Sequence, residues 1–273
     1  MFLSTRARAV LVFTLFLPPL AAVAADKPPP PPDGQAGQIK LDGQWRLELD
    51  RKDVGIPQRW FVRELSRKVN LPGTLTAQGI GDDVTLQTEW TGSIIDRSWF
   101  TSPRYEKYRT SGNLKVPFWL QPTKYYAGAA WYQREIEIPP DWKGRHAVLF
   151  LERPHGQTLV WLDDREIASL YALATPHEYE MGLIQPGRHR LTVRLDNRMI
   201  VDVGPNSHSV SDHTQGNWNG IVGRMELRSS PPIWIDDVQV YPRNDGSVRI
   251  SVALRKEEPL GDMVEVEVVL RDQ

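Results

Sequence analysis

Aromatic and basic side chains concentrate in one irregular stretch of this 273-residue chain. Residues 90–132 hold 11 of its 25 Phe, Trp and Tyr residues, interrupted by glycines and prolines. An aromatic ring can stack on the C–H face of a pyranose, while cationic side chains donate hydrogen bonds to its hydroxyl groups. We predict a carbohydrate-binding surface here, with Trp99 and Trp119 as candidate contacts. The alternative is that these rings only pack the loop onto the fold. The candidate donors are Arg97, Arg104, Lys107, Arg109 and Lys124.

A second stretch, residues 207–220, consists almost entirely of residues that donate or accept hydrogen bonds. Buried polar groups need partners, so this stretch is expected either to face a ligand or to brace a loop. His208, Asp212 and His213 also suggest a metal site. Their spacing matches no standard zinc motif, and we predict no metal.

The sequence lacks residue types and motifs that several reaction classes require. The chain has no cysteine, which removes disulfides, thiolate metal sites and cysteine nucleophiles. It has no Gly-x-Ser-x-Gly elbow, phosphate loop or dinucleotide fingerprint. Most carboxylates alternate with apolar residues, as solvated charges on strands do. We therefore assign no catalytic residue and no cofactor, and the net charge of -1 argues against a nucleic-acid partner.

The elements that must position these stretches are β-strands. Apolar and polar residues alternate with period two in several segments, each typical of a half-buried strand. Turn signals such as Asp163-Asp164 and Pro186-Gly187 separate them, and no long apolar stripe has helical spacing. The fold class is thus predicted to be all-β, an antiparallel β-sandwich. The clearest alternating sets are Trp45/Leu47/Leu49, Tyr132/Ile136/Ile138 and Leu191/Val193/Leu195.

The N-terminus is predicted to direct export. Arg6 and Arg8 precede an apolar run over residues 9–20 and small residues at 22–25, which is the pattern of a secretory signal peptide. Residues 26–38, with five consecutive prolines, are predicted to form a spacer. An exported chain without cysteine needs no oxidative folding, so we expect a bacterial periplasmic or extracellular protein, with no membrane association after signal cleavage.

A domain boundary is predicted near the Ser229-Ser230-Pro231-Pro232 sequence. Residues 39–230 then form the first domain. Residues 231–273 contain three β-rich runs, about half of an immunoglobulin-like sandwich, which needs about seven strands. An unfinished sandwich would expose an apolar face and an unpaired edge. Either these strands pack on the first domain or the natural protein continues beyond Gln273, and we favour continuation.

From Leu41 onward the sequence resembles the N-terminal part of family 2 glycoside hydrolases, the group that contains β-galactosidases, β-glucuronidases and β-mannosidases. The resemblance depends on the order and spacing of several motifs, of which residues 217–223 are the sharpest. Those motifs are Leu41-Asp42-Gly43-Gln44-Trp45, Asn70-Leu71-Pro72-Gly73, Ala130-Trp131-Tyr132-Gln133-Arg134, Glu152-Arg153-Pro154-His155, Leu195-Asp196-Asn197 and Asn217-Trp218-Asn219-Gly220-Ile221-Val222-Gly223.

This resemblance implies a jelly-roll (galactose-binding-like) domain, then an immunoglobulin-like domain, then a TIM barrel that holds both catalytic glutamates. A barrel needs about 250 residues, and no such segment is present, so we expect this chain alone to be inactive. Its first domain would lend loop residues to a sugar site shared with the missing barrel of the same polypeptide. The residue set implied at that site is Asp212, His213, Gln215, Asn217, Trp218 and Asn219.

The leading hypothesis is the sugar-binding region of an exported, β-galactosidase-like hydrolase. Two features depart from or qualify the family pattern: Asp163-Asp164 stands where the family hairpin usually has Asn-Gly, and residues 90–125 resemble the insert of a β-galactosidase-like subgroup. A free-standing carbohydrate-binding protein is the main alternative. A structural or adhesion sandwich without a ligand is a third possibility.

Overall fold

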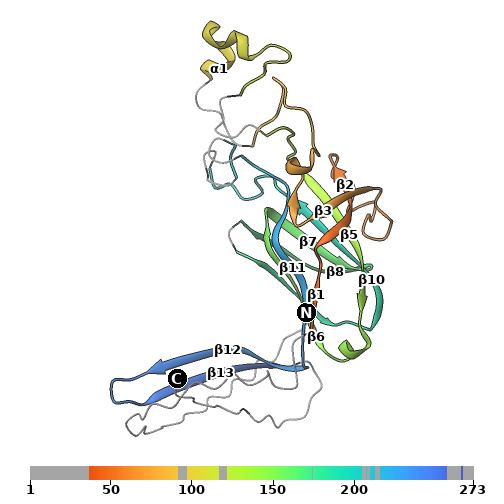
Figure 1. Ribbon diagram of the computed structural model, residues 1–273, viewed down its shortest axis with the longest axis vertical. Helices are drawn as coiled ribbons and strands as arrows, with labels where there is room; N and C mark the ends of the chain where they lie inside the picture. Colours follow the sequence, from red (N-terminus) through yellow and green to blue (C-terminus); the bar gives the residue numbers. More distant parts are fainter. Residues whose placement is uncertain are drawn as a thin grey trace, which may run out of the picture.

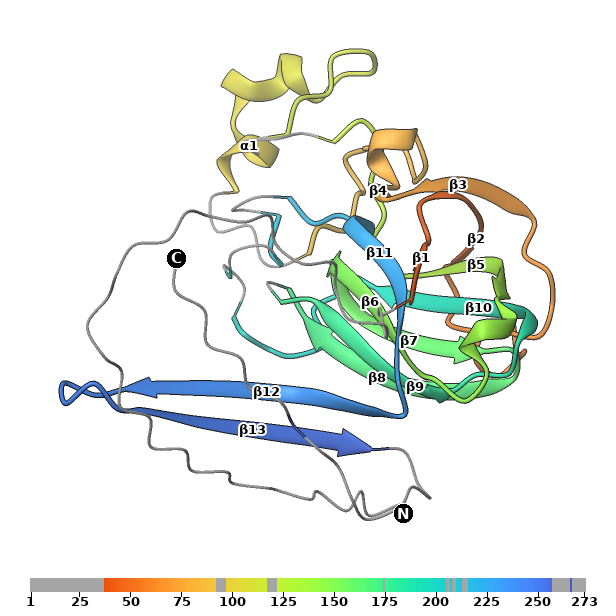
Figure 2. The same cartoon turned by 60° about the horizontal axis from the view of Figure 1, so that its bottom comes forward.

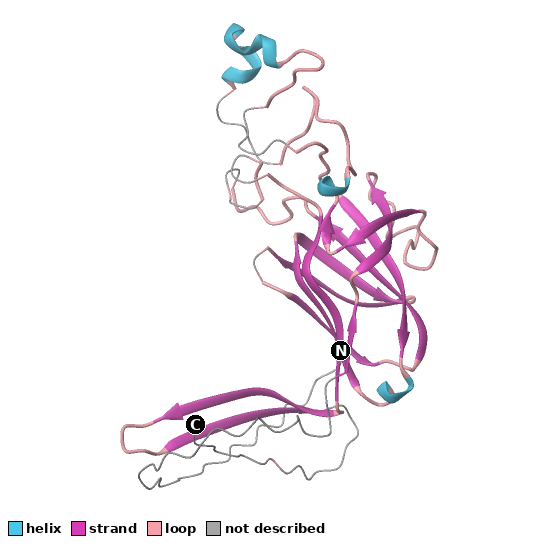
Figure 3. Ribbon diagram, viewed as in Figure 1, coloured by secondary structure: helices cyan, strands magenta, loops and turns pink. Residues whose placement is uncertain are grey.

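Antiparallel strands build two packed sheets in the computed structural model, which describes residues 37–91, 97–116, 122–173, 175–204, 207, 210–212, 216–256 and 266 (Figures 1 and 3). One sheet has six strands in the order β3 (Arg67–Leu71), β2 (Gly43–Asp50), β5 (Ala129–Ile138), β10 (Gly187–Asp196), β7 (Gly156–Leu162) and β8 (Arg165–Ala172). The other has the order β1 (Gly37–Lys40), β11 (Gly220–Ser230), β6 (His146–Pro154) and β9 (His177–Leu183), with β4 (Gly73–Thr74) also paired to β11. The predicted all-β jelly-roll sandwich is confirmed.

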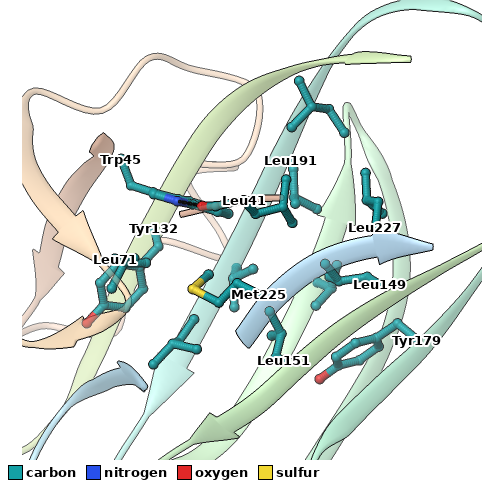
Figure 4. Packing of buried hydrophobic residues seen from close by; sticks show 14 of the residues in the cluster. Leu41, Trp45, Leu71, Tyr132, Leu149, Leu151, Tyr179, Leu191, Met225 and Leu227 are labelled. Carbon is teal, nitrogen blue, oxygen red and sulfur yellow. Dashed lines mark hydrogen bonds between the residues drawn. The ribbon is translucent and has the colours of Figure 1, made fainter. Parts of the chain in front are cut away.

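The main hydrophobic core fills the space between these sheets (Figure 4). Leu191 and Val193 of β10 enter it from one side, and Leu149 and Leu151 of β6 enter it from the other. All four side chains have no exposed surface. Alternation of side chains along each strand sends one face inward, and this burial provides the main drive for folding.

Short turns and helices join the strands. The predicted hairpin at Asp163-Asp164 is confirmed, because Leu162 of β7 pairs with Arg165 of β8 across these two residues. Asp163 has a φ of 56°, the left-handed conformation that such a turn requires and that aspartate tolerates. The short helices are η1 (Thr76–Gln78), α1 (Ser98–Thr101), η2 (Pro103–Tyr108) and η3 (Pro140–Trp142).

The outer face of the six-stranded sheet is covered, which the alternation does not predict. Thr192 and Arg194 of β10 occupy the positions expected to face solvent, yet Thr192 is fully buried and Arg194 is 8% exposed. Trp131 and Trp161 lie on this same outer face and stack with ring centroids 5.0 Å apart. The loop of residues 51–66 closes over them and places Phe61 against Trp161, with centroids 5.1 Å apart. This face therefore has its own small core.

The carboxylate of Asp50 holds the covering loop in place. Asp50 is 2% exposed and lies at the end of β2, where the loop begins. It accepts hydrogen bonds from the backbone N–H groups of Val54 and Gly55, both at 2.8 Å, and from the indole N–H of Trp131 at 3.0 Å. One buried anion thus satisfies two loop amides and one core indole.

Beyond β11 the chain forms a hairpin of β12 (Ile233–Pro242) and β13 (Val248–Lys256), which lies below the two packed sheets in the view of Figure 2. Trp234 stacks on His146 with ring centroids 3.9 Å apart, and Arg255 pairs with Glu180 at 3.1 Å. Two of the three predicted β-rich runs are therefore strands. The third, over residues 263–270, lies outside the described residues except Val266, and the immunoglobulin-like domain stays a prediction.

At the other end of the chain, β1 begins at Gly37, so two residues of the predicted spacer belong to a strand. The predicted signal peptide over residues 1–25, and the rest of the spacer, lie outside the described residues. Within the described ranges, no helix is both long and apolar enough to cross a membrane.

Replacing Asp50 by alanine tests the role of the buried carboxylate. D50A leaves three donors without their acceptor, so we expect the free energy of unfolding to fall by about 3 kcal/mol. Urea unfolding followed by tryptophan fluorescence measures this change, because Trp131 lies in the small core. D42A is the control, since Asp42 is exposed, and we expect a change within about 0.5 kcal/mol. Equal stabilities of D50A and D42A would contradict this account.

Candidate functional site

The polar stretch before β11 closes one end of the sandwich, and Asp212 is its central residue. Asp212 is 4% exposed. Its Oδ2 accepts hydrogen bonds from the Thr91 backbone N–H at 2.6 Å and from the Tyr125 hydroxyl at 2.8 Å. Its Oδ1 accepts one from the Asn217 backbone N–H at 2.8 Å. The Asp212 carboxylate therefore joins three loops that are far apart in the sequence.

Three buried asparagines extend this network toward the core. The Asn217 amide donates to the carbonyl oxygen of Asn197 at 2.7 Å. Asn197 in turn accepts at Oδ1 from the backbone N–H of Gly128 at 2.9 Å. Asn219 accepts from the Tyr132 hydroxyl at 2.7 Å and donates to the Gly128 carbonyl oxygen at 3.0 Å. The sequence left open whether this stretch contacts a ligand or braces a loop. For Asp212, Asn217 and Asn219, the polar side-chain atoms brace loops.

The motif around residue 220 has a steric reason as well. Gly220 has a φ of 147°, and a Cβ at this position would collide with the carbonyl oxygen of Gly73 in β4. Glycine therefore lets β11 approach β4 closely. Just before it, the carbonyl oxygen of Asn219 accepts from the backbone N–H of Leu75 at 2.9 Å. Asn219 and Gly220 together fix the start of β11.

A hollow of about 540 Å³ opens beside the braced loops. Two of its lining residues, Thr91 and Tyr125, are the direct partners of Asp212. Trp90 packs against Tyr125 with ring centroids 4.7 Å apart and an angle of 57° between the ring planes. The hollow thus combines an aromatic wall with polar groups at its rim. Its lining residues are Asp82, Asp83, Thr85, Gln87, Thr88, Glu89, Trp90, Thr91, Tyr125, Ala127, Arg198 and Met199.

Most charges around this hollow are paired. Asp82 accepts from Arg51 at 2.6 Å, and Asp83 accepts from Lys124 at 2.6 Å. Arg198 donates to the carboxylates of Asp53 and Asp196, at 2.7 and 2.5 Å. These ion pairs fix the positions of the side chains at the rim. The lining residues themselves include three acidic residues and one basic residue, Arg198.

The protonation states of this region follow from burial and pairing. Burial raises the pKa of Tyr125, and the nearby Asp212 carboxylate raises it further, so the phenol keeps its proton and donates. Burial alone would raise the pKa of Asp196, but hydrogen bonds from Arg198 outweigh it and lower that pKa below 3.8. Hydrogen bonds from Arg198 likewise lower the pKa of Asp53 below 3.8.

The other predicted site residues do not gather at this hollow. Trp218 is half-buried and stacks on His155, with ring centroids 4.3 Å apart. Trp99 lies in α1, where it is 4% exposed and packs edge-on against Phe100. His213, Gln215 and Trp119 lie outside the described residues.

Six residues between positions 82 and 89, together with Arg198, line the hollow but were not singled out in the sequence. Their order shows neither strand alternation nor a motif, so only the fold reveals that they meet. Asn197 stood within the quoted Leu195-Asp196-Asn197 motif, and Trp90 and Tyr125 stood within the aromatic stretch. The motif and the aromatic stretch are therefore the two sequence features that could have pointed to Asn197, Trp90 and Tyr125 as residues at or beside the hollow.

The chemistry that this arrangement supports is recognition. An aromatic wall beside hydrogen-bonding rim groups suits the two kinds of surface on a sugar. In the part of the chain that the structure describes, no three His, Cys, Asp or Glu side chains are grouped so that they could hold a metal ion. The fold is thus a jelly-roll domain, with its candidate site in the loops at one end.

Comparison with known proteins identifies the class. The family described as glycosyl hydrolases family 2, sugar binding domain, matches residues 39–231. This chain belongs to that family.

Solved structures of similar fold include β-glucuronidases. One is from an uncultured Clostridium species, with a TM-score of 0.55 and 18% identity. Two are from Ruminococcus gnavus, in complex with D-glucaro-d-lactam at a TM-score of 0.57 and with D-glucuronic acid at 0.56, both at 15% identity. Each alignment covers 85% of this chain and 36% of the other. At these identities the likeness shows the fold alone, and the chain spans about a third of the length of those proteins.

The ion pairs of Arg198 predict an acid-sensitive contribution to stability. Since the folded-state pKa values of Asp53 and Asp196 are lowered, their contribution is present above about pH 4 and is lost as the pH falls below it. R198Q removes the guanidinium group whose hydrogen bonds lower the pKa values of Asp53 and Asp196. Because Arg198 and Asp53 are both partly exposed, solvent screens their attraction, and we expect R198Q to be about 1 kcal/mol less stable at pH 6. Its further loss on acidification should be smaller than that of the parent chain.

Urea unfolding at a series of pH values measures both effects. R67Q is the matched control, because Arg67 is an exposed arginine on β3. Parallel pH curves for R198Q and the parent chain would show that Arg198 does not shift these carboxylates.

Proposed function

We propose that this chain is the sugar-binding N-terminal region of an exported glycoside hydrolase, with catalysis performed by a barrel elsewhere in the same polypeptide. The observation that carries the proposal is the hollow beside Asp212, in which Trp90 and Tyr125 form an aromatic wall. Family membership supports the hydrolase class. The coverage of 36% of the β-glucuronidase chains supports a longer whole.

The hollow would hold a sugar by stacking and hydrogen bonding. The half-exposed Trp90 offers its ring to a pyranose face, while Thr88, Gln87 and Glu89 at the rim offer partners for hydroxyl groups. Asp212 acts as a positioning residue, since it holds the backbone of Thr91 and the hydroxyl of Tyr125. The other residues implied by the family resemblance, Trp218 among them, remain candidates for contacts made together with the barrel.

The charge of the lining favours a neutral sugar. Arg198 of the lining and its neighbours Arg51 and Lys124 are already paired with carboxylates, and Glu89 adds a further acid to the lining. A carboxylated sugar would find these three cations occupied and would meet the Glu89 side chain, which lowers its affinity. This argument supports the β-galactosidase-like assignment over a uronic acid at this position.

Export supports a role in degrading polymers outside the cytoplasm. The charged start, apolar run and small residues over positions 1–25 are the basis of this part of the proposal. A fusion of residues 1–25 to a reporter enzyme that is active only after export tests it, with R6E/R8E as the variant. Reporter activity that does not depend on residues 1–25 would overturn the export proposal.

The isolated chain should bind sugar without cleaving it. We expect no release of nitrophenol from nitrophenyl β-galactoside or β-glucuronide above the uncatalysed rate. Glycosidic hydrolysis needs two carboxyl groups placed on either side of the bond, and two of the three acids that line the hollow are paired with Arg51 and Lys124 instead. Turnover by the purified chain that disappears in D82N or D83N would refute the proposal.

Changing the aromatic wall should weaken sugar binding. We expect W90A to reduce the affinity for a β-linked galacto-oligosaccharide about tenfold, because the stacking surface is lost. D212N should weaken binding less, because it displaces the wall without removing it. Titration calorimetry measures both, and circular dichroism checks the fold of each variant.

Two further variants make this experiment decisive. Y241A removes an exposed ring on the β12–β13 hairpin and should leave affinity unchanged. W99A changes the aromatic group in α1 and leaves the Trp90–Tyr125 wall of the hollow in place, so comparing it with W90A shows which aromatic group binds the sugar. If W99A abolished binding while W90A did not, the free-standing carbohydrate-binding alternative, which uses the aromatic loop, would replace the present assignment of the hollow.

A further inference from the structure

Residues 97–116 form a small lobe that projects from the loop end of the sandwich (Figures 1 and 3). We call it the basic lobe; it contains α1 and η2. In the sequence it is inserted between Thr91 and Tyr125, which are two walls of the hollow. The lobe and the hollow therefore lie at the same end of the sandwich (Figure 1).

The basic lobe has an excess of positive charge. It contains five Lys and Arg residues and one acid, Glu106, although the whole chain has a net charge of -1. Among the described residues, no carboxylate lies within ion-pairing distance of any of the five cations, whereas cations near the hollow, such as Arg51 and Arg198, are paired. The five are Arg97, Arg104, Lys107, Arg109 and Lys115.

Aromatic rings take the place of carboxylates as neighbours of four of these cations, while Arg109 donates to the backbone carbonyl oxygen of Ser102 at 3.1 Å. Arg104 lies 4.4 Å from the ring centroid of Tyr105, and Lys107 lies 4.9 Å from that of Tyr108. Lys115 approaches the same Tyr108 ring at 5.7 Å. These three cations are exposed, and both rings are half-exposed. Cation–π contacts orient the cations without neutralising them, so their charge stays available to a ligand.

We propose that the basic lobe binds the carboxylate groups of an acidic polysaccharide while a neutral unit of the same polymer occupies the hollow. This inference rests on the proposed function of the hollow. The cations beside the hollow are paired with carboxylates, whereas no such pair is found for the lobe cations among the described residues. The lobe therefore attracts the carboxylated units of one polymer, and the hollow suits its neutral units. The half-exposed Tyr105 and Tyr108 rings provide surfaces for sugar faces beside the cations.

The position of the lobe favours a glycan over another polyanion. An acidic protein or a nucleic acid could bind the charged groups of the lobe. It would make no use of the aromatic hollow, whose residues Thr91 and Tyr125 flank the lobe in the sequence. An acidic polysaccharide uses both surfaces. The alternatives become outcomes of the experiment.

A matched pair of ligands tests the inference. One is a β-linked galacto-oligosaccharide; the other has the same length, with part of its C6 hydroxyl groups oxidised to carboxylates. At low salt we expect the carboxylated ligand to bind about ten times more tightly than the neutral one, a gain that exposed charges can supply. We expect 0.5 M NaCl, as an experimental condition, to remove most of the gain, because the charges are exposed.

The triple variant R104Q/K107Q/K115Q should remove the gain and leave binding of the neutral ligand unchanged. The matched control R67Q/K68Q/K143Q removes three exposed cations elsewhere, so it changes the net charge equally and should keep the gain. Equal affinities of the parent chain for the two ligands, or equal losses in the two triple variants, would overturn the inference. Binding of polyglutamate as tight as that of the carboxylated glycan would overturn it in favour of a general anion surface.

The same measurements separate the two proposals. Affinity for the neutral ligand, and its loss in W90A, tests the sugar site in the hollow. The ratio of affinities for the two ligands, and its change in the lobe variant, tests the lobe. A chain that bound only the carboxylated ligand, through the lobe alone, would refute the proposed hollow and with it the two-surface inference.

Discussion

The loop end of the sandwich depends on one requirement, that every buried polar group has a hydrogen-bond partner. The loops that close this end bring backbone amides and carbonyls into the protein interior, where an unpaired group costs about 1 to 3 kcal/mol. Asp212, Asn197, Asn217 and Asn219 meet this need with side-chain atoms, in bonds of 2.6 to 3.0 Å. Because Asp212 holds both Thr91 and Tyr125, the shape of the hollow is set by this internal bracing.

The sequence predicted the parts of the fold that follow from local periodicity. Alternating residues such as Leu191 and Val193 define the inner faces, and Asp163-Asp164 marks a hairpin, because both depend on neighbouring positions alone. It did not predict the burial of Thr192 and Arg194, since their cover comes from residues 51–66, more than 120 positions away. The hollow was missed for the same reason: its walls come from three separate segments and meet only in the folded chain.

The polar stretch before β11 shows a subtler limit of sequence reasoning. A run of hydrogen-bonding residues is equally compatible with contact to a ligand and with bracing of loops. The deciding fact is which partners lie nearby, and for Asp212 these are Thr91 and Tyr125. The residues identified from the sequence therefore lie next to the candidate site, one layer beneath the surface that a sugar would touch. Bracing residues and contact residues share the same chemistry, so composition alone does not distinguish them.

The side chains around the hollow combine the two kinds of surface that binding of a sugar would use. Asp82 and Asp83 line it with exposed carboxyl groups, each of which is paired with a cation. Their oxygen atoms can also accept hydrogen bonds from the hydroxyl groups of a ligand. Trp90 and Tyr125 add an apolar surface beside them. A site of this kind would supply affinity and orientation to a bound ligand.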